Sequence, residues 1–388
     1  MQCGKTKKVL VYYSKLNPGG AEKSTLRLIK KMLDAKWSVD LLLRYGGGVL
    51  ESELPKEVNV MYYRGDGSAI EFLKSKKVID RIKGIVMTFS MLICQMVAEL
   101  KLNRRFYDIA IVGLQGLNAK VIARKVNADL KLLWIRSDLR KCDSERKVRD
   151  NIETYKKEID YYPCVSETVV ESFQESFPEL ANRAVLFYNV LEADDMKRKM
   201  NAESVIDGKY KGALKVVTVC RISDKSKGIF RMLDIYERLR NEGIFFYWIV
   251  VGDGTDFAEL KKRVNDKGFE DGFILLGNQK NPFPIYRECD IAAVFSYYEG
   301  LCGNVNEAKV AGLPVVATQF SGINEQIISG ENGLIVDNTF DGAYEGLKKM
   351  LLDEEFRNAV TNDYINKQIV NDDYKLDIFE MLAQKKGK

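Results

Sequence analysis

The sequence predicts an α/β protein with two doubly wound parallel sheets. Short apolar runs rich in valine, isoleucine and leucine alternate with longer segments in which apolar residues recur at helical spacing. The runs are apolar at nearly every position, as expected of strands that are covered by helices on both faces. The alternation occurs in two series along 388 residues, a length that corresponds to about two domains.

Each series supplies the strands of one sheet. The first series comprises Lys8–Tyr13, Val39–Leu43, Val58–Tyr63, Asp108–Gly113, Leu130–Ile135 and Cys164–Ser166. The second comprises Val216–Cys220, Phe246–Val251, Phe273–Leu276, Ile291–Phe295, Val315–Thr318 and Leu334–Val336. The first two strands are separated by Ala21–Lys36, where Ile29 and Met32 belong to an apolar stripe of helical spacing.

The domain boundary is expected in a charged stretch, Glu192–Lys211, that lacks apolar periodicity. We therefore predict a first domain over residues 1–195, a linker over 196–212 and a second domain over 213–363. Ligands of open α/β sheets bind at the carboxyl ends of the strands. We accordingly expect the two sheets to face a central cleft.

The composition excludes several classes of function. Histidine is absent, which rules out Ser-His and Cys-His nucleophile pairs and His-ligated zinc. The seven cysteines are scattered and never form CxxC, so we expect a protein of the reducing cytoplasm without disulfides. The net charge of +5 suits an anionic ligand or membrane surface. We expect no nucleic acid partner, because basic and aromatic residues do not interleave in a coherent stripe.

In each series, a glycine-containing loop follows the first strand. Gly19 and Gly20 open the first helix, where free amides attract anions; a tight strand-to-helix turn is the plainer interpretation. In the second series, Arg221 and Lys227 flank the equivalent turn, and two cations there would neutralise a diphosphate. A solvated basic loop is the alternative. The full GxGxxG fingerprint is missing, which argues against a hydride-transferring enzyme.

The most specific motif extends from Ser296 to Ala308. A buried strand ends at Phe295, a loop carries Glu299, and a helix begins near Gly303 with Glu307 close to its first turn. Loop amides at a helix start can hold a phosphate, and carboxylates on either side can accept hydrogen bonds from sugar hydroxyls. The spacing of the two glutamates, with seven residues between them, could arise by chance. Their positions at a strand end and a helix start make the motif specific.

These motifs resemble those of retaining, family-4 type glycosyltransferases of the GT-B fold, which build bacterial capsular, exopolysaccharide and lipopolysaccharide glycans. The resemblance is specific from about Lys215 to Leu352 and weaker in the first half. It implies two Rossmann-like domains, the first binding the acceptor and the second a nucleotide sugar. It also implies that residues 364–388 form a helix that crosses back to pack on the first domain.

The resemblance also assigns roles to individual residues. Arg221 and Lys227 would grip the donor diphosphate, Glu299 the sugar hydroxyls and Glu307 the ribose. The backbone of Gly303, Asn304 and Val305 would cap the phosphate, with Gly19 and Gly20 approaching it from the other domain. Asn278 and Gln279 occupy the position that binds the nucleobase in the family. Many relatives carry histidine where this chain has Arg136, and an arginine there donates hydrogen bonds but cannot act as a general base.

The expected reaction is transfer of a hexose, most simply from a UDP-sugar, to a glycan or lipid-linked glycan. No Asp-x-Asp clamp occurs at a strand end, so neither a metal nor another cofactor is expected. We expect a cytoplasmic protein at the inner face of the membrane. Two alternatives remain open: a nucleotide-sugar epimerase of the same fold, and an inactive subunit that binds sugar nucleotides.

One segment of the first domain raises the question of membrane contact. A basic stretch, Lys74–Lys83, precedes the largely apolar Ile85–Val97, and Lys101, Arg104 and Arg105 follow. A helix with this pattern could lie on an anionic leaflet, making the protein a peripheral membrane protein. The other interpretation is a buried helix with solvated ends. No run of about 18 uninterrupted apolar residues occurs, so no spanning helix is expected.

Overall fold

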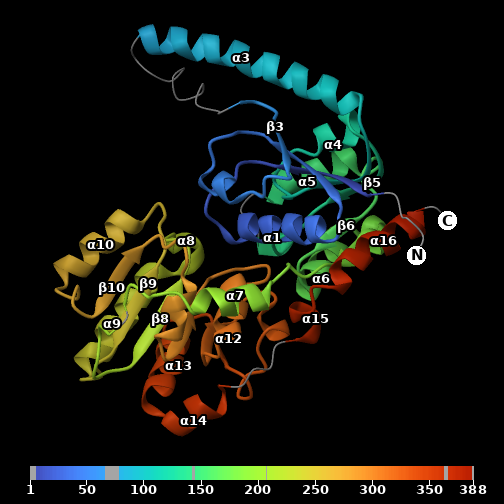
Figure 1. Ribbon diagram of the computed structural model, residues 1–388. Helices are drawn as coiled ribbons and strands as arrows, with labels where there is room; N and C mark the ends of the chain where they lie inside the picture. The colour runs from blue at the N-terminus through green and yellow to red at the C-terminus, as the bar shows by residue number, and fades with distance from the viewer. Residues whose placement is uncertain (1–5, 66–77, 142–144, 207, 362–365, 387–388) are drawn as a thin grey trace. The chain divides into compact units, whose positions relative to one another are not determined.

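The computed structural model describes residues 6–65, 78–141, 145–206, 208–361 and 366–386 (Figure 1). The chain divides into two compact units. Unit 1 comprises residues 1–165, 169–190 and 371–388, and unit 2 comprises residues 166–168 and 191–370. Each unit is an α/β body with its own parallel sheet, which confirms the predicted fold class.

The sheet of unit 1 has the order β3-β2-β1-β4-β5, and all four pairings are parallel. Its strands are β1 (Lys8–Tyr13), β2 (Ser38–Leu43), β3 (Asn59–Tyr62), β4 (Phe106–Val112) and β5 (Asn127–Leu133). The central strand β1 is buried from Val9 to Tyr13, as its uninterrupted apolar run predicts. A separate parallel pair is formed by β6 (Tyr162–Cys164) and β7 (Ala184–Leu186), the second of which the sequence analysis missed.

Helices flank this sheet. They are α1 (Gly20–Asp34), α3 (Val78–Asn103), α4 (Lys120–Lys125), α5 (Glu145–Tyr155), α6 (Glu167–Ser176) and α16 (Tyr374–Lys386), with short 3-10 helices at Val49–Glu53, Leu139–Lys141 and Pro178–Arg183. The predicted stripe of α1 faces the sheet, since Ile29 and Met32 are fully buried. The first residues of α6 belong to unit 2 and the remainder to unit 1.

The C-terminal helix α16 belongs to unit 1 although it follows unit 2 in the chain. Its Phe379 is fully buried, and the ring lies 5.0 Å from that of Phe187, 6.1 Å from that of Trp37 and 6.4 Å from that of Trp134. The ammonium of Lys386 contacts Asp160 at 2.7 Å. Aromatic packing and an ion pair therefore attach the end of the chain to unit 1.

The sheet of unit 2 has the order β10-β9-β8-β11-β12-β13 and is parallel throughout. Its strands are β8 (Lys215–Val219), β9 (Tyr247–Val251), β10 (Phe273–Gly277), β11 (Ile291–Val294), β12 (Val315–Thr318) and β13 (Leu334–Val336). Both sheets extend from their first strand in one direction and then reverse to its other side, the order of a doubly wound fold.

The helices of unit 2 enclose a core centred on Trp248, Phe246 and Tyr236. They are α7 (Ala193–Met200), α8 (Asp224–Lys227), α9 (Ile229–Asn241), α10 (Phe257–Asp266), α11 (Phe283–Arg287), α12 (Gly303–Val310), α13 (Phe340–Leu352), α14 (Glu354–Ala359) and α15 (Lys367–Val370), with a 3-10 helix at Ile323–Glu325. The side chains of Val216, in β8, and Phe295, directly after β11, also belong to this core.

The predicted linker over residues 196–212 is wrong. The structure places this stretch inside unit 2, where α7 includes its first residues. Met196 and Met200 lie one helical turn apart and are both buried, as is Ile206. Eight residues are too few to show a clear periodicity among many charges, and so a packed helix looked like a solvated connector.

Helix α3 differs from the expectation of a buried helix. It is not a buried core helix, because large apolar side chains along its length are exposed, among them Phe89 at 66% and Met96 at 65%. Its segment Ile82–Asn103 is long and apolar enough to cross a membrane, the one such helix in the described part of the chain. The criterion of uninterrupted apolar residues missed it because Thr88, Ser90 and Gln95 interrupt the run without adding charge.

Replacing Phe379 with alanine tests the attachment of α16. Removing a buried phenylalanine that packs on three rings is expected to cost about 3–5 kcal/mol of stability. The change is measured as a lower midpoint of urea unfolding, monitored by tryptophan fluorescence. Met381→Ala on the same helix, where the side chain is 42% exposed, is the matched control and should change stability by less than about 0.5 kcal/mol. Equal midpoints for both variants would contradict the packing role.

Candidate active site

The candidate site lies where the strand order of unit 2 reverses. Strands β8 and β11 are neighbours, with Val216 paired to Ile291, although 75 residues separate them in the chain. Parallel strands end at the same edge of a sheet, and so the loops after β8 and β11 emerge side by side. These loops carry Lys227 and Glu299, two of the predicted catalytic residues.

Lys227 and Glu299 form an ion pair between the lysine Nζ and the glutamate Oε1. Their side chains are only 18% and 15% exposed. The hydroxyl of Ser296 donates a second hydrogen bond to the same carboxylate oxygen, at 2.9 Å. The structure therefore brings the predicted diphosphate cation and the predicted sugar-binding carboxylate together in one partly buried cluster.

The backbone around this cluster has little freedom. Gly228, directly after Lys227, has φ of +62°, and a Cβ there would lie 2.8 Å from the carbonyl oxygen of Phe295. Only glycine meets both requirements, the left-handed conformation and the close approach of the two loops. The amide of Tyr297 donates to the carbonyl of Ser226 at 2.9 Å, which joins the two loops directly.

Arg231 holds the loop after β11 through hydrogen bonds. It is 7% exposed and donates to the carbonyl of Phe295 and, at 2.9 Å, to the side-chain oxygen of Asn338. The amide of Asn338 donates in turn to the carbonyls of Ser296 and Tyr297, at 3.1 and 3.0 Å. These bonds fix the path of the chain from Phe295 to Glu299.

The ion pair changes the titration of its lysine. Burial alone would lower the pKa of Lys227, but the negative charge of Glu299 opposes this and holds the pKa above its ordinary value. Two thiols line the same region. Burial raises the pKa of Cys220 to about 12 and also raises that of Cys302, so both stay protonated near neutral pH and neither supplies a thiolate nucleophile.

The start of α12 provides the amides that the sequence analysis assigned to a phosphate. Gly303 is exposed, and a Cβ added to it would meet nothing within 4 Å. The side chain of Asn304 is used elsewhere, since its amide donates to the carbonyl of Val219 at the end of β8. Val305 is fully buried. The side-chain nitrogen of Asn304 is thus engaged and Val305 has no exposed side chain, while phosphate binding by the backbone of these residues stays a prediction.

A glutamine that the sequence analysis missed holds this helix start in place. Gln326 is 2% exposed; its oxygen accepts from the amide of Cys302 at 3.1 Å, and its nitrogen donates to the carbonyl of Cys302 at 2.7 Å and to Asn306 at 2.8 Å. The hydroxyl of Ser166 donates to the carbonyl of Gly300 at 2.9 Å. Neither contact could be found from sequence, because both join distant parts of the chain.

The remaining predicted residues of unit 2 occupy different environments. Arg221 is exposed just beyond the end of β8. Glu307 is 5% exposed within α12, one turn from Gly303. Asn278 and Gln279 follow β10, where Asn278 is exposed and the amide of Gln279 donates to the carbonyl of Leu276 at 2.8 Å. Arg221 and Asn278 are therefore accessible to a ligand, whereas Glu307, in α12, is buried.

Three of the predicted site residues belong to unit 1. Gly19 is the N-cap of α1 and Gly20 its first residue, and a Cβ on Gly20 would meet nothing within 4 Å. Arg136 is half-buried just after β5. Its guanidinium donates to the carbonyl of Gly113 at 2.8 Å, to Asn189 at 3.0 Å and to Thr25 at 3.1 Å.

These contacts give Arg136 a structural task. It lies over the ring of Trp134 at 4.8 Å and links the loop after β4 to α1 and to Asn189. Burial lowers the pKa of Arg136, yet an arginine keeps its charge. Its nitrogens are engaged with unit 1 itself, so in this structure the side chain braces the start of α1.

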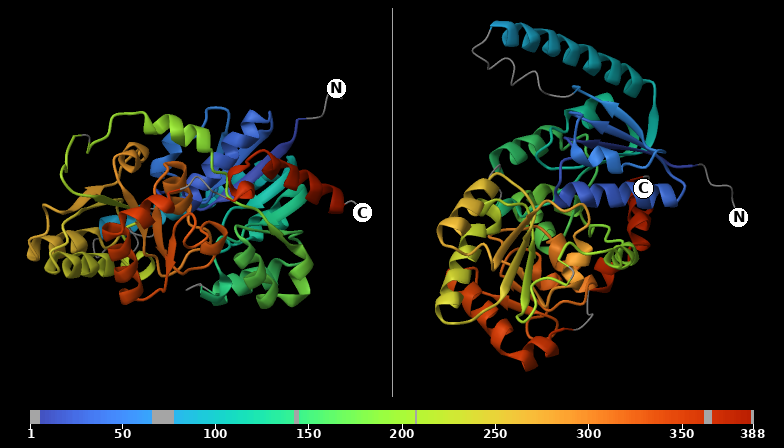
Figure 2. Two further views of the ribbon diagram at one scale, coloured as in Figure 1. Left: turned by 90° about the horizontal axis from the view of Figure 1, so that it is seen from below. Right: turned by 60° about the vertical axis from the view of Figure 1, so that its left-hand side comes forward.

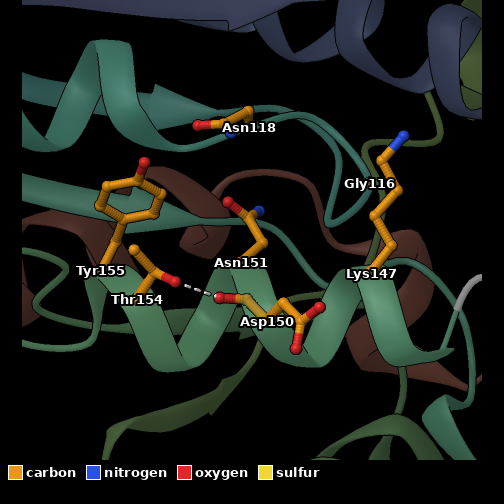
Figure 3. A pocket seen from close by; sticks show the side chains of 7 residues that line it. All are labelled: Gly116, Asn118, Lys147, Asp150, Asn151, Thr154 and Tyr155. Carbon is orange, nitrogen blue, oxygen red and sulfur yellow. Dashed lines mark hydrogen bonds between the residues drawn. The ribbon is translucent and has the colours of Figure 1, made fainter.

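A small cavity in unit 1 lies apart from all predicted residues. Its volume is about 190 Å³, and α5 and the loop after β4 line it with Lys147, Asp150, Asn151 and Gly116 among others (Figure 3). Ligand pockets generally have about 300–1,000 Å³. Within the described ranges, no group of three or more acidic or cysteine side chains is arranged to hold a metal ion.

Taken together, the cluster in unit 2 combines one buried cation, one carboxylate and an open helix start. A cation beside free backbone amides can bind a phosphate group, and a carboxylate fixed by Ser296 can accept hydrogen bonds from hydroxyls. Such preorganised charges stabilise a developing negative charge without reorganisation.

The second part of the chain is similar to a known protein family. Residues 200–366 match the family model described as Glycosyl transferases group 1. A glycosyltransferase of Campylobacter jejuni named for transferring N-acetylgalactosamine to a diphospho-undecaprenol substrate is 25% identical over 195 residues, covering 50% of this chain and 51% of that protein. A Staphylococcus aureus capsular polysaccharide biosynthesis glycosyltransferase is 25% identical over 146 residues, or 35% of this chain and 36% of its own. The chain thus spans about half the length, or less, of these relatives.

Solved structures cover the whole chain. The Anabaena protein HepE in complex with UDP-glucose superposes with a TM-score of 0.71 at 17% identity, over 97% of this chain and 98% of that one. Staphylococcus aureus TarM gives a TM-score of 0.73 at 13% identity, over 99% and 100% of the two chains. At such identities the likeness shows the fold alone, and that fold is GT-B.

The ion pair predicts a specific loss of stability at alkaline pH. The pKa of Lys227 is raised in the folded protein, so the contribution of the pair is complete below the unfolded value of about 10.4 and is lost as the pH rises through the folded value. We compare wild type with the Lys227→Met/Glu299→Gln double variant by urea unfolding. The difference in unfolding free energy should change above about pH 10.4 in the direction that disfavours wild type. A difference that stays constant from neutral pH through the alkaline range would contradict this.

Proposed function

We propose that this chain is a glycosyltransferase that transfers a hexose from a nucleoside diphosphate sugar to a glycan acceptor, and the match of residues 200–366 to the group 1 glycosyltransferase model supports this. The observation that carries the proposal is the pairing of Lys227 with Glu299 beside the open start of α12. The diphosphate would take the ammonium of Lys227 and the amides of α12, and the sugar hydroxyls the carboxylate of Glu299. Arg221, exposed nearby in sequence, would add a second cation.

The ion pair gives the free enzyme a definite starting state. An unpaired charge at 15–18% exposure would be costly, and each partner stabilises the other until a donor arrives. When a donor binds, its diphosphate would replace Glu299 as the anionic partner of Lys227. The sugar hydroxyls would replace Lys227 as the hydrogen-bond donors to Glu299. Donor binding therefore exchanges interactions without leaving either charge exposed to an apolar environment.

UDP is the nucleotide we propose, with GDP as the next candidate. It is supported by the solved relative HepE, which binds UDP-glucose, and by the position of Asn278 and Gln279 at the end of a strand of the same sheet. We propose that neither a metal nor another cofactor takes part. Lys227, Arg221 and the amides of α12 would then supply all the stabilisation of the departing diphosphate.

The acceptor we propose is a growing cell-surface polysaccharide, in many cases carried on a lipid. The curated relatives support this, since their names refer to capsular polysaccharide and to diphospho-undecaprenol. The reaction would take place in the cytoplasm at the inner face of the membrane, where nucleotide sugars are available. Arg136 would act as a positioning residue that braces α1, while Gly20 leaves the start of that helix open and Gly19 precedes it.

Substituting the paired residues tests the assignment. Glu299→Gln and Lys227→Met should each lower kcat/KM for sugar transfer by about 10²–10³-fold, because each removes one positioned charge from the transition state. Transfer from radiolabelled UDP-sugars to membrane lipid fractions provides the measurement. Lys348→Met is the matched control: Lys348 pairs with Glu242 at 2.6 Å in the same unit, away from the site loops.

The outcomes separate the alternatives. Normal transfer by both site variants, in protein that is folded by circular dichroism, would overturn the proposal. Conversion of the UDP-sugar without any acceptor would indicate an epimerase. Binding of the UDP-sugar by calorimetry, with no turnover on any lipid fraction, would indicate an inactive binding subunit.

We further propose that transfer retains the anomeric configuration by front-face displacement within an ion pair. The thiols are protonated and Glu299 is already bound to Lys227 and Ser296, so none of them is placed as a covalent nucleophile. With an α-linked donor, proton NMR of the fresh product should show an α-anomeric signal with its small coupling constant. A β-linked product would contradict retention while leaving the transferase assignment intact.

A further inference from the structure

Helix α3 presents a continuous apolar face to solvent. Figure 1 and the right-hand view of Figure 2 show most of α3 standing clear of the sheet of unit 1. Nine large apolar residues, each between 46% and 66% exposed, recur along it at three- and four-residue intervals. We call this set the apolar stripe: Ile82, Ile85, Val86, Phe89, Leu92, Ile93, Met96, Val97 and Leu100.

The stripe faces away from the unit to which the helix is attached. With about 100° of rotation per residue, its members fall within an arc of about 140°. Ala98 and Leu102, which are 4% and 0% exposed, lie on the opposite side of the helix and pack on unit 1. The stripe is thus the outer face of a helix whose inner face is already covered.

The C-terminal end of α3 is fixed to unit 1 by polar contacts as well. Glu99 accepts hydrogen bonds from the hydroxyl of Tyr63 at 2.7 Å and from Gln95 at 3.1 Å. It also pairs with Lys125 at 3.1 Å. The one acidic residue in the second half of the helix is therefore turned toward the protein and neutralised there.

Charge along α3 is confined to its ends. No charged residue occurs from Gly84 to Ala98, on any face of the helix. Lys83 precedes this segment, Lys101 and Arg104 follow it, and all three are exposed. Lys83 and Lys101 are about five turns apart and so leave the helix on the same side, at the edge of the stripe.

We propose that α3 lies flat in the surface of an anionic bilayer. The apolar stripe enters the acyl region, while Lys83, Lys101 and Arg104 reach the anionic headgroups from the edge of the stripe and beyond the helix end. The neutral polar residues Thr88, Ser90 and Gln95 stay at the interface or face the protein. Attachment of this kind concerns where the protein works and does not depend on its donor chemistry.

The topology favours a flat position over a spanning one. Helix α3 connects β3 to β4, and both strands belong to the sheet of unit 1. If α3 crossed the bilayer, the chain between Tyr62 and Val78 would have to cross back, and that segment contains six charged residues in the sequence. Crossing would place these charges in hydrocarbon, at a high cost for each.

The lack of charge also favours lipid over a second copy of the chain. Helices that pair in water carry charged residues beside the apolar seam, which set register and partner. From Gly84 to Ala98 the flanks of the stripe have none. Cations at both ends of an uncharged apolar segment match a lipid surface with anionic headgroups instead.

Co-sedimentation with vesicles tests the proposal on the full chain. Wild type should bind vesicles of phosphatidylglycerol and phosphatidylcholine, and more weakly vesicles of phosphatidylcholine alone. The Phe89→Glu/Met96→Glu double variant should bind the mixed vesicles about 100-fold more weakly, because each side chain contributes roughly tenfold or more when buried. Lys83→Gln/Lys101→Gln should lose about fivefold per lysine.

Two controls keep the result interpretable. Leu352→Glu adds a charge at a 60% exposed apolar position of unit 2 and should bind vesicles like wild type. Circular dichroism and calorimetric binding of a UDP-sugar should be unchanged in the double variant, since the stripe touches neither core nor site. Failure of donor binding in wild type would instead count against the proposed function and leave the vesicle result unaffected.

Two outcomes would overturn the proposal. One is vesicle binding that is absent in wild type or equal in wild type and the Phe89→Glu/Met96→Glu variant. The other is a wild-type dimer in sedimentation velocity that the double variant converts to monomer while neither binds vesicles. The second outcome would assign the stripe to a second copy of the chain.

Discussion

The ion pair between Lys227 and Glu299 is the interaction on which the candidate site depends. Neither charge could remain at its low exposure without the other, because removing either partner leaves an uncompensated buried charge. The two residues are 72 positions apart and meet only because β8 and β11 are neighbours at the point where the sheet reverses direction. The strand order of the doubly wound sheet therefore brings Lys227 and Glu299 together at the edge where β8 and β11 end.

The surroundings of the pair keep it in one geometry. Gly228 allows the two loops to approach, Arg231 and Asn338 bind the carbonyls behind Glu299, and Gln326 fixes the start of α12. In unit 1, the side chain of Arg136 similarly connects the loop after β4 to α1. In each unit an arginine donates to a backbone carbonyl and to neutral side-chain oxygens, Arg231 in unit 2 and Arg136 in unit 1, and so fixes the path of a loop.

Helix α3 is governed by a different balance. An apolar stripe of nine residues left in water costs free energy that the fold recovers nowhere within unit 1, whose contacts with α3 lie on the opposite face. The loops of the candidate site, by contrast, are held by hydrogen bonds from Arg231, Asn338 and Gln326. On the two proposals made above, donor binding and attachment to a membrane would use different elements of the fold.

The sequence by itself determined the fold class, nearly all strands and the residues of the loops after β8 and β11. These features are local, because apolar runs define the strands, and glycine, proline and charged residues define the turns and loops between them. Tertiary structure alone decided which residues meet. It showed that Arg136 is hydrogen-bonded within unit 1, that α7 is packed inside unit 2, that Gln326 holds the start of α12 and that the outer face of α3 is exposed. Burial and long-range hydrogen bonds depend on residues far away in the chain, and no local pattern contains that information.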